Sequence, residues 1–275
     1  MTLRLPRGTI HPSVAVDLQQ TPMQVAFLRP KRLASASIAA KAFTRWPLPA
    51  FASEAELVAM IRGLFAEHSS ERWLWIAELV SPSGIADLAA VRLASGQRTG
   101  ELHRVPARWL YALKSLPTAP FSLGDFAALT NVSSSAARVA LKSYQDAGFC
   151  VYAADKGTWT KVRDPSPVAE KIIAIEAKLS DWRRALYQAS RYTDYATQSW
   201  VVLDSKAFPS ARLHVDEFQH RGIGLAGVSF TGEFEIACSA QSRGPRLPQR
   251  FWQANAEISR HLAASRLQMA PIEGV

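Results

Sequence analysis

Two charged side chains stand inside a stretch that is otherwise typical of a buried strand. The strand expected at residues 171–179 is rich in β-branched and small apolar residues, and it contains Glu176 and Lys178. Because side chains alternate between the two faces of a strand, these two share one face while Ile173 and Ile175 lie on the other. A carboxylate and an ammonium rarely enter so apolar a strand unless they are paired or bind something. The pair is therefore a candidate site, and a solvated strand edge is the alternative.

A second acid stands in an unfavourable place earlier in the chain. Asp87 lies in the middle of a strand expected at residues 85–92, on the face shared by Ile85, Ala89 and Val91. Aspartate is disfavoured in strand interiors. Asp87 is therefore a second candidate, with a turn or cap role as the alternative.

The helix expected after the Glu-x-Lys strand offers further polar groups. Trp182, Ala185, Leu186, Ala189 and Tyr192 recur at helical spacing as one apolar stripe. The other face carries Arg184, Gln188 and Arg191, which can point at an anionic ligand, and Ser180 or Asp181 can cap the start. A second apolar strand is expected at residues 199–205.

A strand with Glu-x-Lys, a helix with a central Gln and a second apolar strand resemble the core of the PD-(D/E)XK nuclease superfamily, the restriction-endonuclease-like fold. That family has the order helix, three strands, helix, strand, with its first acid early in the second strand. The expected elements follow this order, at residues 53–67, 72–80, 85–92, 171–179, 181–197 and 199–205. The resemblance implies an α/β fold whose mixed central sheet is flanked by helices. The departure is the long segment between Asp87 and Glu176, where the family usually has a short hairpin.

The resemblance also implies metal-dependent hydrolysis of phosphodiesters, since carboxylates that hold Mg²⁺ neutralise phosphate charge and generate hydroxide. Asp87 and Glu176 would be the metal ligands, helped by the backbone carbonyl of Ala177. Glu54 on the first helix would add a ligand through water. Glu56 is better placed to form a capping box with Ser53. Mn²⁺ is the alternative ion.

Two further residues would act beside the metal. Lys178 would orient or activate the attacking water and stabilise developing charge. Gln188 would contact the water or a phosphate oxygen. For each of the candidate site residues, a purely structural role is the alternative.

The long segment at residues 101–163 has a pattern of its own. Helices are expected at 105–116, 122–129 and 133–147, followed by a hairpin of residues 149–153 and 158–162. Three helices and a hairpin in this order resemble a winged helix-turn-helix domain. Its implied contacts with duplex DNA are Ser134, Arg138 and Lys142 on the third helix and Lys156 at the hairpin tip, with Arg184 from the core. Dimerisation or protein binding is the alternative role.

Charge and composition favour a polyanionic partner. The 275 residues carry a formal charge of +9, and nucleic acid comes before an acidic membrane surface as the expected partner. Residues 104–163 hold eight Lys or Arg against three Asp, so +5 of the +9 falls in the insertion. Cys150 and Cys238 lie in apolar runs and are expected to be reduced core residues of an intracellular protein. No apolar stretch approaches 20 residues, which disfavours membrane spanning.

The two ends of the chain are less informative. Residues 1–50 are interrupted by prolines, among them Pro6, Pro12, Pro22 and Pro30, and hold five Lys or Arg between positions 29 and 45. They are interpreted as a basic arm or helix. Near the C-terminus, closing strands are expected at 221–230 and 232–239, and an amphipathic helix at 251–267. Residues 51–100 and 164–275 would thus form a discontinuous nuclease core around the insertion.

The sequence predicts a Mg²⁺-dependent DNA endonuclease that acts in the cytoplasm in association with the nucleoid. One rival is a DNA-binding regulator or assembly factor that uses the nuclease fold as a scaffold, with weak or no cleavage. The other is a protein-interaction module that binds acidic partners. A second copy of the chain or another protein is a further expected partner, since cutting both strands normally needs two sites.

Overall fold

The computed structural model of the chain describes residues 50–66, 73–95 and 102–269. The basic arm expected at residues 1–50 lies outside this part, except for its last residue. Among the described helices, none has the length and apolar character needed to cross a membrane. Cys150 and Cys238 are both buried and free, in agreement with their interpretation as core thiols.

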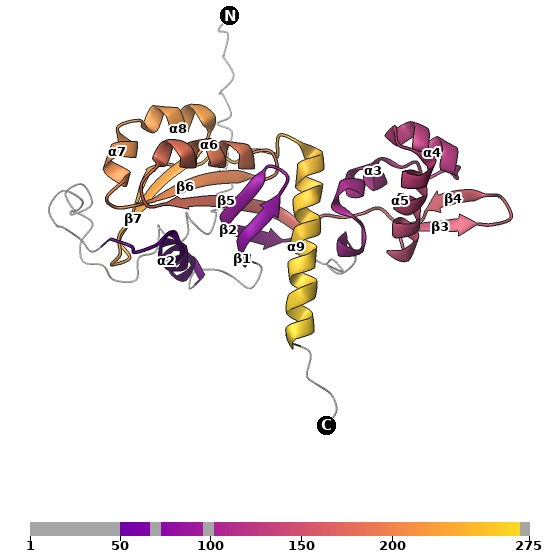
Figure 1. Cartoon of the computed structure of the whole chain (residues 1–275), viewed down its shortest axis with the longest axis horizontal. Coiled ribbons are helices and arrows are strands. Elements are labelled where there is room, and N and C mark those ends of the chain that lie inside the picture. The colour runs from indigo at the N-terminus through magenta and orange to yellow at the C-terminus, as the bar shows by residue number, and fades with distance from the viewer. Residues whose placement is uncertain (1–49, 67–72, 96–101, 270–275) are drawn as a thin grey trace, which may run out of the picture.

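A six-stranded mixed sheet forms the body of the molecule (Figure 1). Its strands, in spatial order, are β1 (Trp73–Ser81), β2 (Gly84–Leu93), β5 (Ala169–Lys178), β6 (Gln198–Asp204), β7 (Gly224–Val228) and β8 (Phe234–Cys238). The three central strands β5, β6 and β7 are parallel to one another, while β1, β2 and β8 pair antiparallel. The sheet confirms the predicted mixed α/β class.

Helices cover both faces of this sheet. On one face, α2 (Glu54–Ala66) packs Leu57, Ile61 and Phe65 against the core. The opposite face carries α6 (Trp182–Tyr192), α7 (Phe208–Arg212) and α8 (Val215–Arg221), as Figure 1 shows. Each helix buries apolar side chains against the sheet, which is the arrangement expected for a sheet that must be covered on both sides.

The central strand β5 has the alternation that its sequence predicts. Ile173, Ile175 and Ala177 pack in the cluster that includes α2. Ile172 and Ala174 pack in the other cluster with α6. By the same alternation Glu176 and Lys178 belong to the α6 side.

The pairing of β1 with β2 is interrupted at one position. The ladder joins Ala77 to Leu88 and Leu79 to Ala86, but it leaves out the intervening pair of Glu78 and Asp87. Glu78 has φ 52°, in the left-handed region that costs an L residue about 1–2 kcal/mol. The backbone is therefore strained directly across from Asp87.

The insertion contains three helices and a hairpin, in the predicted order. Its elements are η2 (Leu102–Arg104), η3 (Ala107–Trp109), α3 (Leu110–Ser115), α4 (Leu123–Thr130), α5 (Ser134–Asp146), β3 (Cys150–Ala153) and β4 (Thr158–Lys161). Ser122 and Asp125 form a capping box at the start of α4, and the Ser133 side chain caps α5. Asn131 ends α4 in the left-handed conformation. These capping residues therefore determine where α4 begins and ends and where α5 begins.

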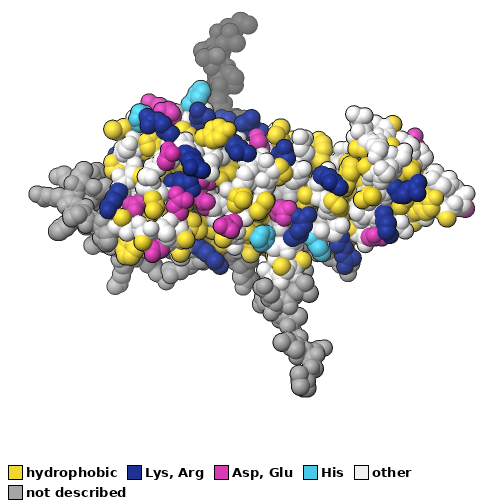
Figure 2. Space-filling view, in the orientation of Figure 1, with side chains coloured by type: hydrophobic (Ala, Val, Ile, Leu, Met, Phe, Trp, Pro, Cys, Tyr) yellow, Lys and Arg dark blue, Asp and Glu magenta, His cyan; other side chains and the backbone are white. Residues whose placement is uncertain are grey.

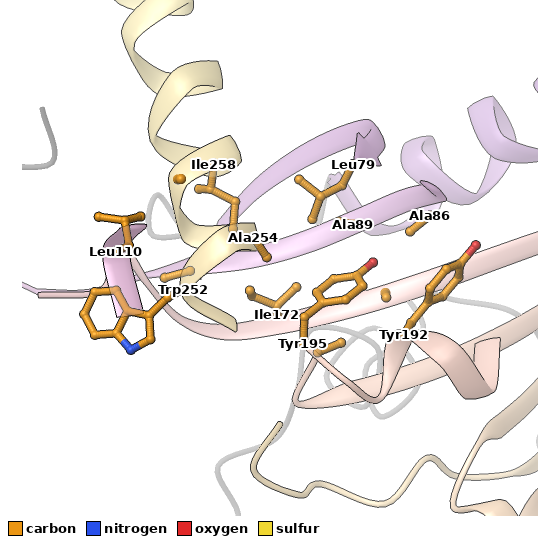
Figure 3. Packing of buried hydrophobic residues seen from close by; sticks show 14 of the residues in the cluster. Leu79, Ala86, Ala89, Leu110, Ile172, Tyr192, Tyr195, Trp252, Ala254 and Ile258 are labelled. Carbon is orange, nitrogen blue, oxygen red and sulfur yellow. The ribbon is translucent and has the colours of Figure 1, made fainter. Parts of the chain in front are cut away.

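The long C-terminal helix α9 (Pro248–Met269) lies between the insertion and the sheet. Figure 3 shows Trp252, Ala254 and Ile258 of α9 among side chains from both sides, including Leu110 of α3 and Leu79 of β1. These residues belong to one continuous buried cluster. The insertion is therefore packed onto the body through α9.

Several predicted boundaries were wrong. The helix expected at 181–197 ends at Tyr192, because the chain turns there and Thr197 Oγ1 donates to Ile172 O at 2.9 Å as β6 begins. The helix expected at 105–116 starts as the short 3₁₀ turn η3 and is α-helical only from Leu110. The strand expected from Arg221 begins at Gly224, because α8 extends to that arginine and ends on Gly222 with φ 72°.

Candidate active site

Three acids converge on one lysine at the end of β5. Lys178 Nζ lies 3.0 Å from Glu54 Oε2, 3.0 Å from Glu176 Oε1 and 3.4 Å from Asp87 Oδ2. It also donates to the carbonyl oxygen of Ala177 at 3.2 Å. We refer to Glu54, Asp87, Glu176 and Lys178 as the acid cluster. Residues far apart in the chain are thus brought together around a single ammonium.

The broken ladder places Asp87 against β5. Pairing of β2 with β5 ends at Leu88 and Ile175, so Asp87 and Glu176 are the next residues on each strand. Beyond that point the Asp87 carboxylate, rather than a backbone carbonyl, accepts the hydrogen bond from Ala177 N at 2.8 Å. Aspartate is unfavourable inside a regular strand. Here the strand pairing stops, and the Asp87 carboxylate serves as the hydrogen-bond acceptor for a backbone N–H that would otherwise lack one.

The first turn of α2 delivers the third acid. Ser53 Oγ accepts from Glu56 N at 3.2 Å, which is one half of the predicted capping box, while Glu56 Oε2 accepts from Ala52 N at 2.8 Å, one residue before the expected cap. Glu56 is therefore occupied at the cap. Glu54, two residues earlier, is left to reach Lys178 across the edge of the sheet.

Tyr192 holds Glu176 inside the protein. The Glu176 side chain is fully buried, and its Oε2 lies 2.5 Å from the hydroxyl of Tyr192, which also lies 2.6 Å from Ile85 O. A hydroxyl has one hydrogen, so it cannot donate to both oxygens at once. A protonated Glu176 that donates to Tyr192 while Tyr192 donates to Ile85 satisfies both contacts.

The electrostatics of the cluster fit this arrangement. Burial raises the pKa of Asp87 above its usual range, more than the hydrogen bond from Ala177 and the charge of Lys178 lower it. Burial likewise raises the pKa of Glu176, with the hydrogen bond to Tyr192 opposing it and the nearby Asp87 adding to it. For Lys178 burial disfavours the charge, but hydrogen bonds to Glu54 and Glu176 and the attraction of the acids outweigh it, so its pKa is raised. The lysine is an ammonium at neutral pH.

The chemical types in the cluster suit a hard divalent cation, because carboxylate and carbonyl oxygens are the ligands that Mg²⁺ prefers. Glu176 Oε1 is buried without a well-formed hydrogen bond, although it lies 3.0 Å from the ammonium, so it retains capacity for another partner. In their present positions the acids surround Nζ, and among the described residues no group of three or more His, Cys, Asp or Glu is placed to hold an ion. Ion binding therefore requires the ammonium to move aside and the acids to close in.

Gln188 and Arg184 lie on α6 but outside the acid cluster. The Gln188 Oε1 atom is buried with no hydrogen-bond partner among the described residues. The Arg184 side chain is exposed, while its backbone N–H donates to the capping side chain of Asp181. The structure thus places neither side chain in contact with Lys178 or the three acids.

The predicted DNA-contacting residues of the insertion lie on its surface. Ser134, Arg138 and Lys142 are exposed at a spacing of four residues, which makes one stripe along α5. Lys142 pairs with Asp146 of the same helix at 3.4 Å, an exposed contact that a phosphate could replace. Lys156 is exposed in the turn that joins β3 to β4.

Sequence reasoning missed Tyr192 and Glu78 as parts of this site. Tyr192 was placed on the apolar stripe of its helix, although a buried tyrosine hydroxyl normally needs a partner and the adjacent strand held an unexplained acid. That combination could have suggested the contact with Glu176. The strained backbone of Glu78 has no comparable signal in the sequence.

Comparisons of the chain with protein-family models, curated proteins and solved structures gave no match. The acid cluster and the surface of the insertion are therefore the features of the molecule that bear on its function.

Proposed function

We propose that the protein is a metal-dependent DNA endonuclease of PD-(D/E)XK type whose inserted winged helix-turn-helix domain binds duplex DNA. The observation that carries this proposal is the convergence of Glu54, Asp87 and Glu176 on Lys178 at the end of a central strand. The order α2, β1, β2, β5, α6, β6 is also the order that the resemblance implies.

The chain's residues have separate roles in this reaction. Asp87, Glu176 and the Ala177 carbonyl would hold Mg²⁺ or Mn²⁺, with Glu54 contributing through water. A bound cation of this kind supplies charge for the scissile phosphate and lowers the pKa of a water molecule. Tyr192 fixes the orientation of Glu176.

Lys178 acts as a cation and a hydrogen-bond donor in this scheme. While it contacts the acids its pKa is raised, so Lys178 is an ammonium in this geometry. Once it leaves the acids, its ammonium stabilises the charge that develops on the phosphate oxygens and orients the attacking water. Gln188, whose Oε1 is buried and unbonded among the described residues, is the proposed contact for that water or for a phosphate oxygen.

The insertion supplies most of the DNA-binding surface. The stripe of Ser134, Arg138 and Lys142 on α5 would enter the major groove, and Lys156 would contact backbone phosphate. Figure 2 shows Lys and Arg side chains over α6 and α8 as well as over the insertion, so Arg184 can extend the contact along the body. Serines and single basic residues read few base edges, so binding is driven mainly by phosphate charge.

A cleavage assay with Mg²⁺ or Mn²⁺ on supercoiled, linear and branched DNA tests the activity. Asp87→Ala and Lys178→Ala are expected to abolish cutting and to retain DNA binding. The double variant Arg138→Ala with Lys142→Ala should bind DNA more weakly, and its binding constant should fall less steeply with salt concentration. Glu56→Gln is the matched control, because this acid is on the same turn as Glu54 but belongs to the cap. Equal cutting by wild type and Asp87→Ala would disprove the assigned site.

A DNA-binding scaffold with weak or no cleavage is the second candidate. Its specific support is that the acids already contact the Lys178 ammonium, so the cluster has a structural role that needs no metal ion. Absence of cutting on every substrate, together with salt-sensitive DNA binding, would favour this candidate. DNA binding that is absent at low salt would leave the protein-interaction role.

A further inference from the structure

A cavity of about 230 Å³ lies at the opposite end of the sheet from the acid cluster. It is formed where the C-terminal end of α6, the start of β6 and the segment 241–246 meet. Three arginines line it, namely Arg221, Arg243 and Arg246, together with polar side chains that include Thr193, Gln198 and Ser199. None of the described residues that line it is an aspartate or a glutamate.

The segment that carries two of the arginines is fixed by its backbone. Arg243 N donates to Thr197 O at 3.0 Å, and Arg246 N donates to Thr193 O at 3.0 Å. Gln241 N donates to Gly222 O, also at 3.0 Å. These bonds tie the backbone of the segment to the ends of α6, β6 and α8, so the Cα atoms of Arg243 and Arg246 are fixed at the rim of one cavity.

The positive charge of the cavity is largely uncompensated. The side chains of Arg221 and Arg243 make no ion pair or hydrogen bond with any other described residue. Arg246 Nε lies 3.7 Å from Asp194 Oδ1, a long contact, and Asp194 also accepts from Ser83 Oγ at 3.0 Å. Clustered guanidinium groups repel one another, and a phosphate that binds them bidentately removes that repulsion.

One amide side chain among the lining residues has spare hydrogen-bonding capacity. Gln198 lines the cavity with only 7% of its surface exposed. Its Oε1 accepts a long hydrogen bond from Trp200 Nε1 at 3.5 Å, while its Nε2 donates to no described residue. Gln198 therefore keeps amide hydrogens that can donate to a further acceptor.

We propose that this cavity is a phosphate-binding site, distinct from the acid cluster. Gln198 is opposite Ile173 in the sheet and Lys178 is opposite Leu203, so about five strand residues, roughly 16 Å, separate the two sites. The volume suits a phosphate group with part of its attached sugar, and it is below the roughly 300–1,000 Å³ of typical small-molecule pockets. The phosphate could belong to a free nucleotide or to a nucleic acid strand. The proposal holds whether or not the protein cuts DNA.

Binding measurements with EDTA present separate this proposal from the nuclease activity. The probes are inorganic phosphate, a nucleoside 5′-monophosphate, and one short single-stranded oligonucleotide with either a 5′-phosphate or a 5′-hydroxyl. Calorimetry at low salt should detect binding to the full-length wild type. Replacing both Arg243 and Arg246 by Ala should weaken it by roughly tenfold or more, because charge-assisted hydrogen bonds are lost.

The matched control is Arg62→Ala, which removes an equal kind of charge from an exposed position on α2 and should leave the affinity unchanged. The double variant keeps the backbone hydrogen bonds of the segment, and an unchanged melting temperature without ligand would verify its fold. Replacing both arginines by Lys retains the positive charge but not the planar guanidinium group, which binds phosphate through two hydrogen bonds. This variant should bind more tightly than the double Ala variant and more weakly than wild type.

The probes also identify the source of the phosphate. Equal affinity for the mononucleotide and the 5′-phosphorylated strand would indicate a free nucleotide. Preference for the 5′-phosphorylated strand would indicate a strand end, and arginine-dependent binding of the 5′-hydroxyl strand would indicate an internal phosphodiester. The proposal is overturned if none of the probes binds wild type, or if the double variant binds them as wild type does.

Discussion

Glu176 is a carboxyl group in the middle of the protein, and its contacts show why the fold tolerates it. One oxygen faces the Tyr192 hydroxyl and the other faces the Lys178 ammonium. Burial of a carboxylate costs free energy unless such partners are present. The same partners fix the orientation that a metal ligand requires, so stability and proposed function depend on one set of contacts.

Tyr192→Phe is expected to lower the free energy of unfolding by about 1–3 kcal/mol, since it leaves a buried acid without its hydroxyl partner. In the proposed nuclease it should also reduce the cleavage rate while DNA binding persists. Urea denaturation and the cleavage assay measure the two effects. Tyr187→Phe is the control, because Tyr187 lies on the same helix with 63% of its surface exposed and should change neither. Equal stability of the two variants would show that the contact with Glu176 contributes little.

Glu176→Gln is expected to change the pH dependence of stability. The pKa of Glu176 is raised in the folded protein, so the folded state binds this proton more tightly than the unfolded chain does. Its contribution to stability is therefore fully present below the ordinary value of 4.5 and is lost as pH rises through the raised pKa. Glutamine lacks this titration, so the free energy of unfolding of the variant should rise relative to wild type from about pH 4.5 upward. Parallel urea curves between pH 4 and 8 test it, and a constant difference would contradict the shifted pKa.

At the level of residues, the sequence was informative where local pattern alone places a side chain. The alternation of β5 put Glu176 and Lys178 on one face, and the capping box separated Glu56 from Glu54. The distance between Asp87 and Lys178 depends on how β2 pairs with β5 across the whole insertion, and only the fold supplies it. Periodicity also could not assign a partner to Tyr192, because a stripe does not show where a hydroxyl points.

At the level of elements, the irregularity of β1 and β2 is the feature that aims Asp87. A regular pair at Glu78 and Asp87 would direct hydrogen bonds between these strands, but the ladder omits this position. Glu78 adopts φ 52° there, and Asp87 bonds to Ala177 N of β5. Local backbone strain of this kind is found where a structure re-aims a side chain.

Glu78→Gly is expected to raise the free energy of unfolding by up to about 1 kcal/mol, because glycine adopts positive φ without the steric cost. The neighbouring exposed Ala77 has no positive φ, so Ala77→Gly should instead lower it by about 0.5–1 kcal/mol. Chemical denaturation of both variants gives the comparison. Destabilisation by both substitutions would mean that the conformation at Glu78 carries no strain.

Elements were predictable where caps and periodicity agree, and less so where short helices join strands. Ser133 and the alternation of β5 fixed α5 and β5 closely. The short helices α7 and α8 were missed, because five and seven residues are too few to show a stripe. Their formation depends on Phe208 and Phe218, which are buried against the sheet, and thus on tertiary packing.

At the level of the whole molecule, α9 makes the insertion and the body one packed unit. Trp252 is 4% exposed and lies in the same buried cluster as Leu110 of the insertion and Leu79 of the sheet, as Figure 3 shows. Lys114 of α3 places its ammonium 5.5 Å from the centre of the Trp252 ring. A sequence of 275 residues with a long inserted segment is equally compatible with two independent domains, so this coupling could not be predicted from the chain alone.

Trp252→Ala should therefore affect both parts at once. Removal of a buried tryptophan typically costs about 3–5 kcal/mol, and here the cavity would open at the junction of the insertion with the sheet. Calorimetry of wild type should show one cooperative transition, because one cluster spans both parts, whereas the variant should unfold at lower temperature with its transition split or broadened. Ser265→Ala, an exposed change on the same helix, is the control and should leave the transition unchanged. A wild type that already unfolds in two separate steps, or a variant with unaltered melting, would show that α9 does not couple the insertion to the acid cluster.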